Sequence, residues 1–330
     1  MHSTPVCQPT ATANRICRLS ALQQGGRSRP QSGFMNKQEI AMRSIQKILV
    51  VIPPLQDSLA LQRGQQLALT LGAELHLLVC DQQMERRELL DQQLASLHRL
   101  GLRAHGEQAR VTAHQVCDAI LAACHAQNCD LLIKQHQPEE LLGKLFSSPD
   151  DRQLIRQSPV PLLLVQNPRP WAGGTVLAAM DVEHQDAAHL ALQGNVMDHA
   201  NELCQLFGAR LHVVSAYDPA LLQADPSAPI DQASASHCHD QCQWFQNEYE
   251  LPEQQLHIGE GPAKALIPRI ALQLEAAVTV LGTVARHGLS GLLIGNTAEA
   301  VLDRLNSDML ILKPHTADAQ QTEFAGHRAA

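Results

Sequence analysis

The sequence predicts an α/β protein built from two tandem doubly wound parallel five-stranded sheets. Short apolar runs alternate with amphipathic helical segments, which is the pattern of parallel strands joined by crossover helices. Several segments recur in two halves of the chain, which indicates an internal duplication. The 330 residues also exceed one average domain, because single cores stop growing at roughly 250 residues. We therefore expect two domains of the same fold.

In the first half, residues 48–52 form a continuous apolar run, which is typical of a strand buried on both faces. A helix is expected from about Ser58 to Leu71, because Gly72 stands where a helix commonly ends. The remaining elements are expected as strands at 75–80, 103–107, 131–134 and 162–165, and as helices at 83–100, 114–127 and 151–156. Five strands with crossover helices predict a parallel sheet.

The second half repeats this order. The matching segments are 48–52 with 176–180, 72–79 with 208–215, and Arg156 plus 162–164 with Arg304 plus 310–312. The second copy carries extra residues, chiefly in the stretch 218–229, which is rich in Pro, Ala and Ser. Three matches in one order predict that the chain arose by duplication.

These patterns predict the domain boundaries. We expect a disordered N-terminal segment at 1–43, a first domain at 44–166, a linker at 167–173, a second domain at 174–314 and a disordered tail at 315–330. The first segment is rich in Ser, Gln, Pro, Gly and Arg and has no sustained periodicity. A targeting peptide or a misassigned upstream start codon would also account for it.

Composition excludes several classes of partner. A formal net charge of -8 argues against broad nucleic-acid binding, which needs clustered Lys and Arg. No apolar run approaches the roughly 20 residues that span a bilayer, so we expect no membrane segment. The 9 cysteines are irregularly spaced in a long chain, which fits a reducing compartment and predicts a cytoplasmic protein.

Two loops of the second half carry the residue types of a ligand site. In a doubly wound sheet, ligands bind beyond the carboxyl ends of the strands where the strand order reverses, which means after the first and fourth strands. Asp181 follows the first of these strands, and the glycine-rich stretch 282–297 follows the fourth. Glycines let backbone amides approach phosphate oxygens, and a helix that starts near Thr297 would add its N-terminal amides. This arrangement suits a polyphosphate.

The glycine-rich stretch resembles the nucleotide signature of universal stress proteins, Gly-x2-Gly-x9-Gly-Ser/Thr. Gly282 and Gly295 match its first and third glycines. Ala285 stands in place of the second glycine, and Asn296 replaces the hydroxyl residue, with Thr297 immediately after it. Arg286 lies in the same loop and is counted among the expected ligand contacts.

The resemblance covers nearly everything from Met42 to Pro314 and, with the duplication, points to the tandem, UspE-like subgroup of the family. It implies a role in bacterial stress response and a site for ATP or a related adenine nucleotide, with Mg²⁺ as a companion ion, in the C-terminal domain. By the same resemblance, Asp181 would lie near the ribose, and the backbone around Ala216 would meet the adenine.

A simpler interpretation of the glycines is that they only permit tight turns. Asn296 would then cap the last helix, and Glu299, three residues later, would supply the second side chain of a capping box. In the first half the corresponding chemistry is lost, since Pro53 and Pro54 follow the first strand and only one glycine remains after the fourth. We expect that half to be a structural or partner-binding copy.

A second cluster, Cys238, His239 and Cys242, has the residue types of a metal site. The two cysteines share a helical face, but small buried cysteines on an amphipathic helix explain them more simply. We therefore expect no metal there, and zinc in particular is disfavoured.

The function classes that remain are a binding protein, an enzyme and a scaffold. No Walker loop and no Gly-x-Ser-x-Gly elbow occurs, so we expect a non-catalytic or nearly non-catalytic nucleotide-binding stress protein. The alternatives are a nucleotide-free scaffold that binds unidentified protein partners and a weak ATP hydrolase. The two domains could pair within one chain as a pseudo-dimer, or the chain could form a homodimer.

Overall fold

The computed structural model describes residues 42–53, 58–82, 84–136, 139–141, 144–146, 149–181, 187–217, 246, 249, 251–283 and 296–313. The N-terminal segment up to 41 and the tail from 314 onward lie outside these ranges. Met42 already belongs to a short 3-10 helix, η1 (Met42–Ser44), and its side chain is buried. The described structure therefore begins within the segment that the sequence analysis assigned to disorder.

The first half contains the expected strands and helices. In chain order they are β1 (Lys47–Ile52), α1 (Leu59–Leu71), β2 (Glu74–Cys80), α2 (Arg87–Arg99), β3 (Ala104–Ala109), η2 (Ala113–Gln115), α3 (Val116–Gln127), β4 (Leu131–Gln135), β5 (Glu139–Leu141), β6 (Lys144–Phe146), α4 (Pro149–Gln157) and β7 (Leu162–Val165). The small antiparallel pair of β5 and β6 was not expected, because its sequence contains no alternating apolar pattern.

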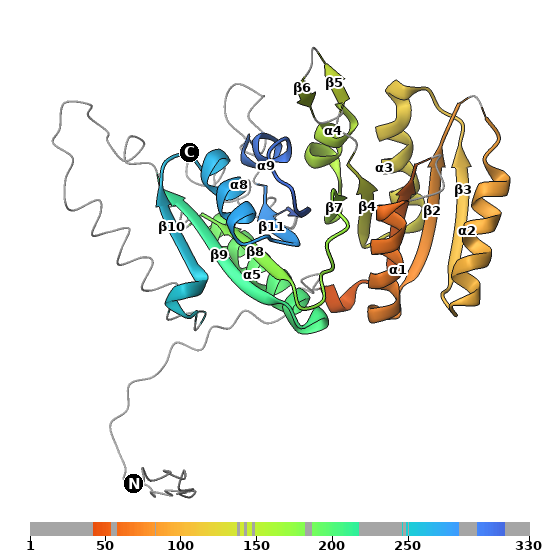
Figure 1. The fold of residues 1–330 in the computed structure, drawn as a ribbon. Coiled ribbons are helices and arrows are strands. Elements are labelled where there is room, and N and C mark those ends of the chain that lie inside the picture. Colours follow the sequence, from red (N-terminus) through yellow and green to blue (C-terminus); the bar gives the residue numbers. More distant parts are fainter. Residues whose placement is uncertain are drawn as a thin grey trace, which may run out of the picture. The chain divides into compact units, whose positions relative to one another are not determined.

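The second half repeats the order. Its described elements are β8 (Thr175–Met180), α5 (Ala187–Phe207), β9 (Arg210–Tyr217), η3 (Glu253–Gln255), β10 (Leu256–Glu260), α8 (Ala263–Gln273), β11 (Val278–Gly282), α9 (Asn296–Leu302) and β12 (Asp308–Leu312). Figure 1 shows the two halves side by side, with the second half at the left.

Helix α1 shows why these residues fold as they do. The Ser58 hydroxyl accepts a hydrogen bond of 3.1 Å from the Leu61 amide and so caps the helix at its start. Gly72 ends the helix with a φ of 71°, a left-handed conformation that costs glycine little. The buried side chains between them, Leu67 and Ala68 among others, face the sheet.

Ten of the described strands, all except β5 and β6, form a single sheet in the order β10-β9-β8-β11-β12-β7-β4-β1-β2-β3. All neighbours are parallel except β7 and β12, which pair antiparallel at the centre. The α/β fold and the doubly wound order of each five-stranded set are thus as expected. What the sequence did not reveal is that the two sets join edge to edge through their last strands.

The pairing register relates the two halves by a pseudo-twofold axis. Leu131 of β4 pairs with β1 at the position where Val278 of β11 pairs with β8, so these two residues are counterparts. In the same way, Leu162 of β7 beside β4 is the counterpart of Met309 of β12 beside β11. By the same spacing, Leu163 is the counterpart of Leu310. These two residues pair with each other across the joint, so the axis passes between them.

This register corrects one sequence match. Arg156 was aligned with Arg304, but the spacing of the strands makes Asp303 the counterpart of Arg156. The burial of the helices agrees with the register, because Leu154 and Ile155 are buried in α4 and their counterparts Val301 and Leu302 are buried in α9. The sequence match was one residue out of step because Arg and Leu recur by chance at that separation.

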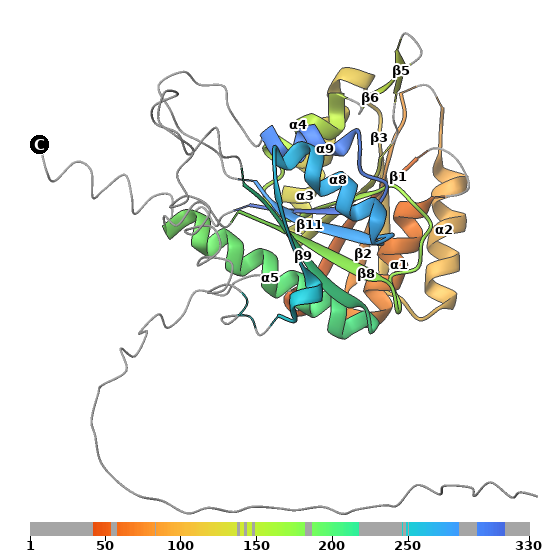
Figure 2. The ribbon, with the colours of Figure 1, turned by 60° about the vertical axis from the view of Figure 1, so that its left-hand side comes forward.

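Helices cover both faces of the sheet. One core lies between the strands and α1, α2 and α5, and the other lies between the strands and α3, α4, α8 and α9. Figure 2 shows α5 and α8 on opposite sides of β8, β9 and β11. Along β1, Ile48 and Val50 enter the first core while Leu49 and Val51 enter the second, as expected for a strand buried on both faces.

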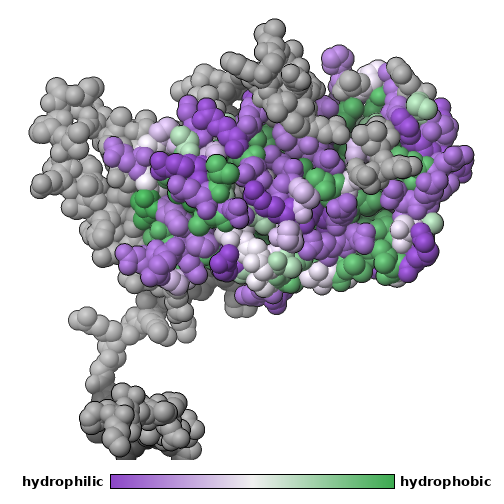
Figure 3. Space-filling view, viewed as in Figure 1, coloured by the Kyte–Doolittle hydropathy of each residue, from purple (hydrophilic) through white to green (hydrophobic). Residues whose placement is uncertain are grey.

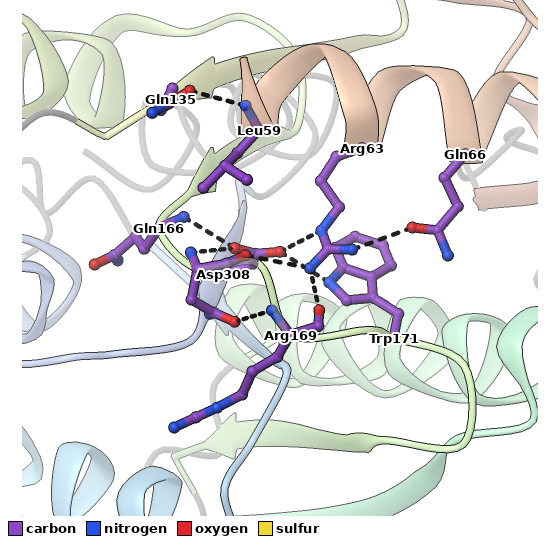
Figure 4. A network of polar contacts seen from close by, with 9 residues as sticks. Leu59, Arg63, Gln66, Gln135, Gln166, Arg169, Trp171 and Asp308 are labelled. Carbon is purple, nitrogen blue, oxygen red and sulfur yellow. Dashed lines mark hydrogen bonds and ion pairs between the residues drawn. The ribbon is translucent and has the colours of Figure 1, made fainter. Parts of the chain in front are cut away.

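A buried polar network ties the linker to both halves (Figure 4). Asp308, the first residue of β12, is 0% exposed, and one of its oxygens accepts from Arg63 Nε of α1 at 2.7 Å and from Trp171 Nε1 of the linker at 2.9 Å. Its other oxygen accepts hydrogen bonds from the backbone amides of Gln166 and Asn167 at 2.9 and 3.3 Å. The guanidinium also lies over the Trp171 ring, with its central carbon 5.0 Å from the ring centroid.

One face of the described structure is mostly polar. Hydrophilic residues dominate the face in Figure 3, and apolar residues appear between them in small groups. Within the described ranges, no helix combines the length and apolar character that a bilayer crossing would require.

Candidate functional site

Three residues around the predicted site lie at the same height along the strands, at the carboxyl edge of the sheet in the second half. Continuing the register of β8 with its neighbours beyond Met180 places Asp181 level with Ala216 of β9 and Thr283 after β11. β8 and β11 are the neighbouring strands between which the strand order reverses. The topology therefore creates the kind of crevice in which this class of fold binds ligands.

Asp181 directly follows β8 and is half-buried. Its backbone carbonyl accepts a hydrogen bond from the Gln193 side chain, which connects the end of the strand to α5. Ala216 lies one residue before the end of β9 and pairs with Gly259 of β10. Both residues are positioned by regular strands, so their backbone is held rigidly at the edge.

Gly282, the last residue of β11, has a packing role that is independent of any ligand. A Cβ built at this position would lie 2.5 Å from Leu192 Cδ2 of α5. Because α5 covers the face opposite to α8 and α9, the missing side chain allows the helix to approach the sheet. The space that Leu192 of α5 needs is therefore sufficient to explain why a glycine stands at this position.

Helix α9 begins at Asn296, with the exposed Thr297 as its second residue. Its first turn contains Glu299, whose two oxygens accept from Arg156 Nε and Nη2 at 2.7 and 2.6 Å. Arg156 belongs to α4 of the other half. The Glu299 carboxylate is therefore engaged across the joint, which differs from the capping role that the turn interpretation gave it.

The other predicted residues lie outside the described parts of the chain. These are Ala285, Arg286 and Gly295 of the glycine-rich loop, and Cys238, His239 and Cys242 of the proposed metal cluster. Among the residues that the structure does describe, no group of three or more His, Cys, Asp or Glu side chains is arranged to hold a metal ion.

The corresponding edge of the first half has different chemistry. Pro53 directly follows β1, at the place that Asp181 holds after β8, as the sequence predicted. The Gln135 side chain at the end of β4 accepts a hydrogen bond of 3.0 Å from the Leu59 amide, the first residue of α1. A protein side chain thus satisfies a helix amide that an anion could otherwise contact.

A buried charge cluster lies at the same edge. Asp151 of α4 is 0% exposed and accepts from Lys134 Nζ at 2.6 Å and from His136 Nδ1 at 2.7 Å. Burial alone would raise the pKa of Asp151, but the bonds from His136 and Lys134 outweigh it and hold that pKa below its ordinary value. The Lys134 ammonium at this edge is therefore already paired with a carboxylate of the protein.

Sequence reasoning missed several of these residues. Lys134 and His136 lie at the end of β4 and Asp151 lies in α4, and only the docking of α4 brings them together. Lys313, after β12, was also missed, although it donates to the Arg156 and Ser158 carbonyls at the end of α4 at 2.7 and 2.8 Å. Burial lowers the pKa of Lys313 to about 8. No local motif signals such contacts between distant segments.

Comparisons with known proteins agree with the fold and cover both halves. A family model described as the universal stress protein family matches residues 174–313. A crystal structure of a putative universal stress protein from Pseudomonas aeruginosa is 43% identical, covers 86% of this chain and 99% of its own, and superposes with a TM-score of 0.74.

Two further relatives extend the match. A crystal structure of a functionally unknown protein from Pseudomonas aeruginosa is 43% identical over 88% of this chain and 100% of its own, with a TM-score of 0.75. Universal stress protein E of Escherichia coli is 29% identical over 303 residues, which cover 83% of this chain and 95% of that protein. The similarity therefore includes the first half, which the family model does not match.

Proposed function

Because the chain belongs to the universal stress protein family, we propose that it acts in the bacterial stress response by binding ATP or a related adenine nucleotide in its second half. The observation that carries the proposal is that Asp181, Ala216 and Thr283 lie level at the carboxyl edge of the sheet, where the strand order reverses between β8 and β11. The glycine-rich loop follows β11 directly, so its amides would reach the same crevice.

The contrast between the halves supports the choice of the second. The first half has Pro53 at the position of Asp181, and its Lys134 and His136 side chains are bound to Asp151. A nucleotide phosphate there would have to displace a buried carboxylate, which is costly because the displaced carboxylate would be left buried without its partners. We therefore propose a single nucleotide site per chain, together with a structural first half.

A thermal-shift titration with ATP and Mg²⁺ tests the proposal. A ligand that binds only the folded state at 100 times its Kd stabilises it by about 2.7 kcal/mol. With an unfolding entropy of about 2.1 cal/mol/K per residue, a chain of 330 residues gains about 1.5 °C in Tm per kcal/mol, so the expected rise is about 4 °C. We expect a rise with the wild type and its loss in Asp181→Ala. The control variant is Asp118→Ala, which removes an exposed carboxylate of α3 and should keep the shift.

The alternatives predict other outcomes of the same experiment. No shift at millimolar nucleotide, with the protein folded, would contradict the nucleotide site and favour the partner-binding scaffold. A shift accompanied by phosphate release above the level of Asp181→Ala would favour the weak hydrolase. Native mass spectrometry of the purified protein identifies a co-purifying adenine nucleotide directly.

A further inference from the structure

Two helices from opposite halves meet beside the central joint of the sheet. Helices α4 and α9 contact one another and lie side by side next to β7 and β12 (Figures 1 and 2). Two ion pairs connect them. Arg152 Nη2 lies 2.6 Å from Asp303 Oδ2, and Arg156 holds Glu299 through two bonds. Asp303 is in the turn directly after α9.

The pseudo-twofold axis relates these two ion pairs. By the register of the strands, Glu299 is the counterpart of Arg152, and Asp303 is the counterpart of Arg156. Each pair is therefore the image of the other with its charges exchanged. The first half supplies both cations and the second half supplies both carboxylates.

The two carboxylates are the less exposed members of these pairs. The side chain of Glu299 is 9% exposed and that of Asp303 is 23% exposed, against 48% for Arg156 and 35% for Arg152. A bidentate contact to a carboxylate that is nearly removed from water is stronger than an ordinary surface pair. Bringing a second anion to Glu299 would likewise cost more than at an exposed position.

The strands of the joint cannot provide this selectivity. The antiparallel contact of β7 with β12 uses backbone hydrogen bonds, and the apolar residues Leu163 and Leu310 meet at its centre. Two β7 strands from separate copies could form the same ladder, because a strand edge is a template for any other strand. In such a contact Arg152 would face Arg156 of the other copy. Two second halves would bring Glu299 against Asp303.

We propose that the contact of α4 with α9 is a charge-coded pairing surface, whose partner is a half of the opposite type and which rejects a like half from a second copy. The attractive part is the exchanged pair of arginines and carboxylates. The repulsive part is the like-charge contact that any symmetric pairing would create. Charge thus directs a first half to a second half, and the linker makes the second half of the same chain the nearest one available.

Charge reversal in the full chain recreates the rejected contacts. In Arg152→Glu with Arg156→Glu, carboxylates face carboxylates, as in a pair of second halves. In Glu299→Arg with Asp303→Arg, arginines face arginines, as in a pair of first halves. The quadruple variant restores opposite charges with exchanged positions. The control for the first double variant is Arg87→Glu with Arg99→Glu, which makes the same change of net charge at two exposed positions of α2.

We expect each double variant to raise the unfolding equilibrium constant at least about tenfold in urea titrations at low salt, which corresponds to about 1.4 kcal/mol. The quadruple variant should return to within about threefold of the wild type, and the control should stay there as well. Hydrogen exchange monitored by mass spectrometry adds a local measurement. Protection of β7 and β12 should fall in the double variants and recover in the quadruple one, while β2 and β3 stay unchanged.

Two results would overturn the proposal. One is a quadruple variant that is as unstable as the two double variants together, because the charges would then act independently of one another. The other is a pair of double variants that match the control in stability and in the protection of β7 and β12. Either result would show that the strands and apolar contacts hold the joint together without a contribution from these charges.

Discussion

Replacing Asp308 with Asn should break hydrogen bonds of the buried network that joins the linker to both halves, and should thereby lower the stability of the folded protein. Each carboxylate oxygen of Asp308 accepts two hydrogen bonds, one from Arg63 and Trp171 and the other from the Gln166 and Asn167 amides. An Asn amide offers only one oxygen, so either orientation directs its NH2 group at two donors. The substitution also removes the negative charge from a site that is 0% exposed.

The expected cost follows from this geometry. Arg63 is 8% exposed and would keep its positive charge without the carboxylate that neutralises it. Removing one partner of a buried ion pair costs about 3–5 kcal/mol. Since a folded domain is stable by about 5–15 kcal/mol, Asp308→Asn should remove a large share of the total. Guanidinium unfolding followed by circular dichroism measures this loss as a lower midpoint.

A double-mutant cycle separates the pair from its surroundings. In Arg63→Met with Asp308→Asn the buried cation is absent, so the loss should be smaller than the sum of the two single losses by about 2 kcal/mol. Asp118→Asn is the matched control at an exposed position of α3 and should stay within about 0.5 kcal/mol of the wild type. If Asp308→Asn were equally mild, the reasoning about the buried network would be refuted.

Three further predictions concern single positions. The folded-state pKa of Asp151 lies below its ordinary value, so its carboxylate stabilises the protein above about pH 4 and this contribution is lost as the pH falls through the lowered pKa. Asp151→Asn should lower Tm at pH 7 and flatten the acid side of the Tm profile, and an unchanged profile contradicts this. Gly282→Val should cost about 1–3 kcal/mol through its contact with Leu192, and Leu192→Ala should relieve part of that cost in the double variant, as measured by chemical unfolding. Gly72→Ala should cost about 1 kcal/mol because φ is 71° there, whereas Gly194→Ala, in α5 with open space around it, should be neutral or stabilising; equal effects at the two glycines would exclude the backbone explanation.

The elements that the sequence predicted well are those encoded by local signals. β7 was expected at residues 162–165 and is found there, because a short apolar run bounded by turn residues is typical of a strand buried on both faces. α1 starts after Ser58 and ends before Gly72, because both caps act within one turn of the helix.

The elements that the sequence missed depend on distant partners. The β5 and β6 pair lies in a stretch interpreted as a loop, and its three-residue strands carry too few side chains to show a periodicity. The alignment of Arg156 with Arg304 was one residue out of step, since two similar letters in similar helices do not reveal the register of a sheet. The docking of α4 decided that Asp151 binds Lys134 and His136.

The candidate site divides in the same way. The sequence located Asp181 and Gly282 at strand ends, because apolar runs mark where strands stop. It could not tell that the space beside Gly282 belongs to Leu192 of α5. Helix packing assigns a structural task to a glycine that the motif alone would give to a ligand.

The amino-acid sequence by itself determined the α/β class, the duplication and the order of elements, because these follow from apolar periodicity and caps that act over a few residues. Only the tertiary structure decided that β7 and β12 join two sheets into one and that Asp308 holds the linker between them. It also decided that arginines of α4 face carboxylates at α9. The reason is physical: hydrogen-bond register and buried charge pairing act between segments that are far apart in the chain, and no local pattern records their distance.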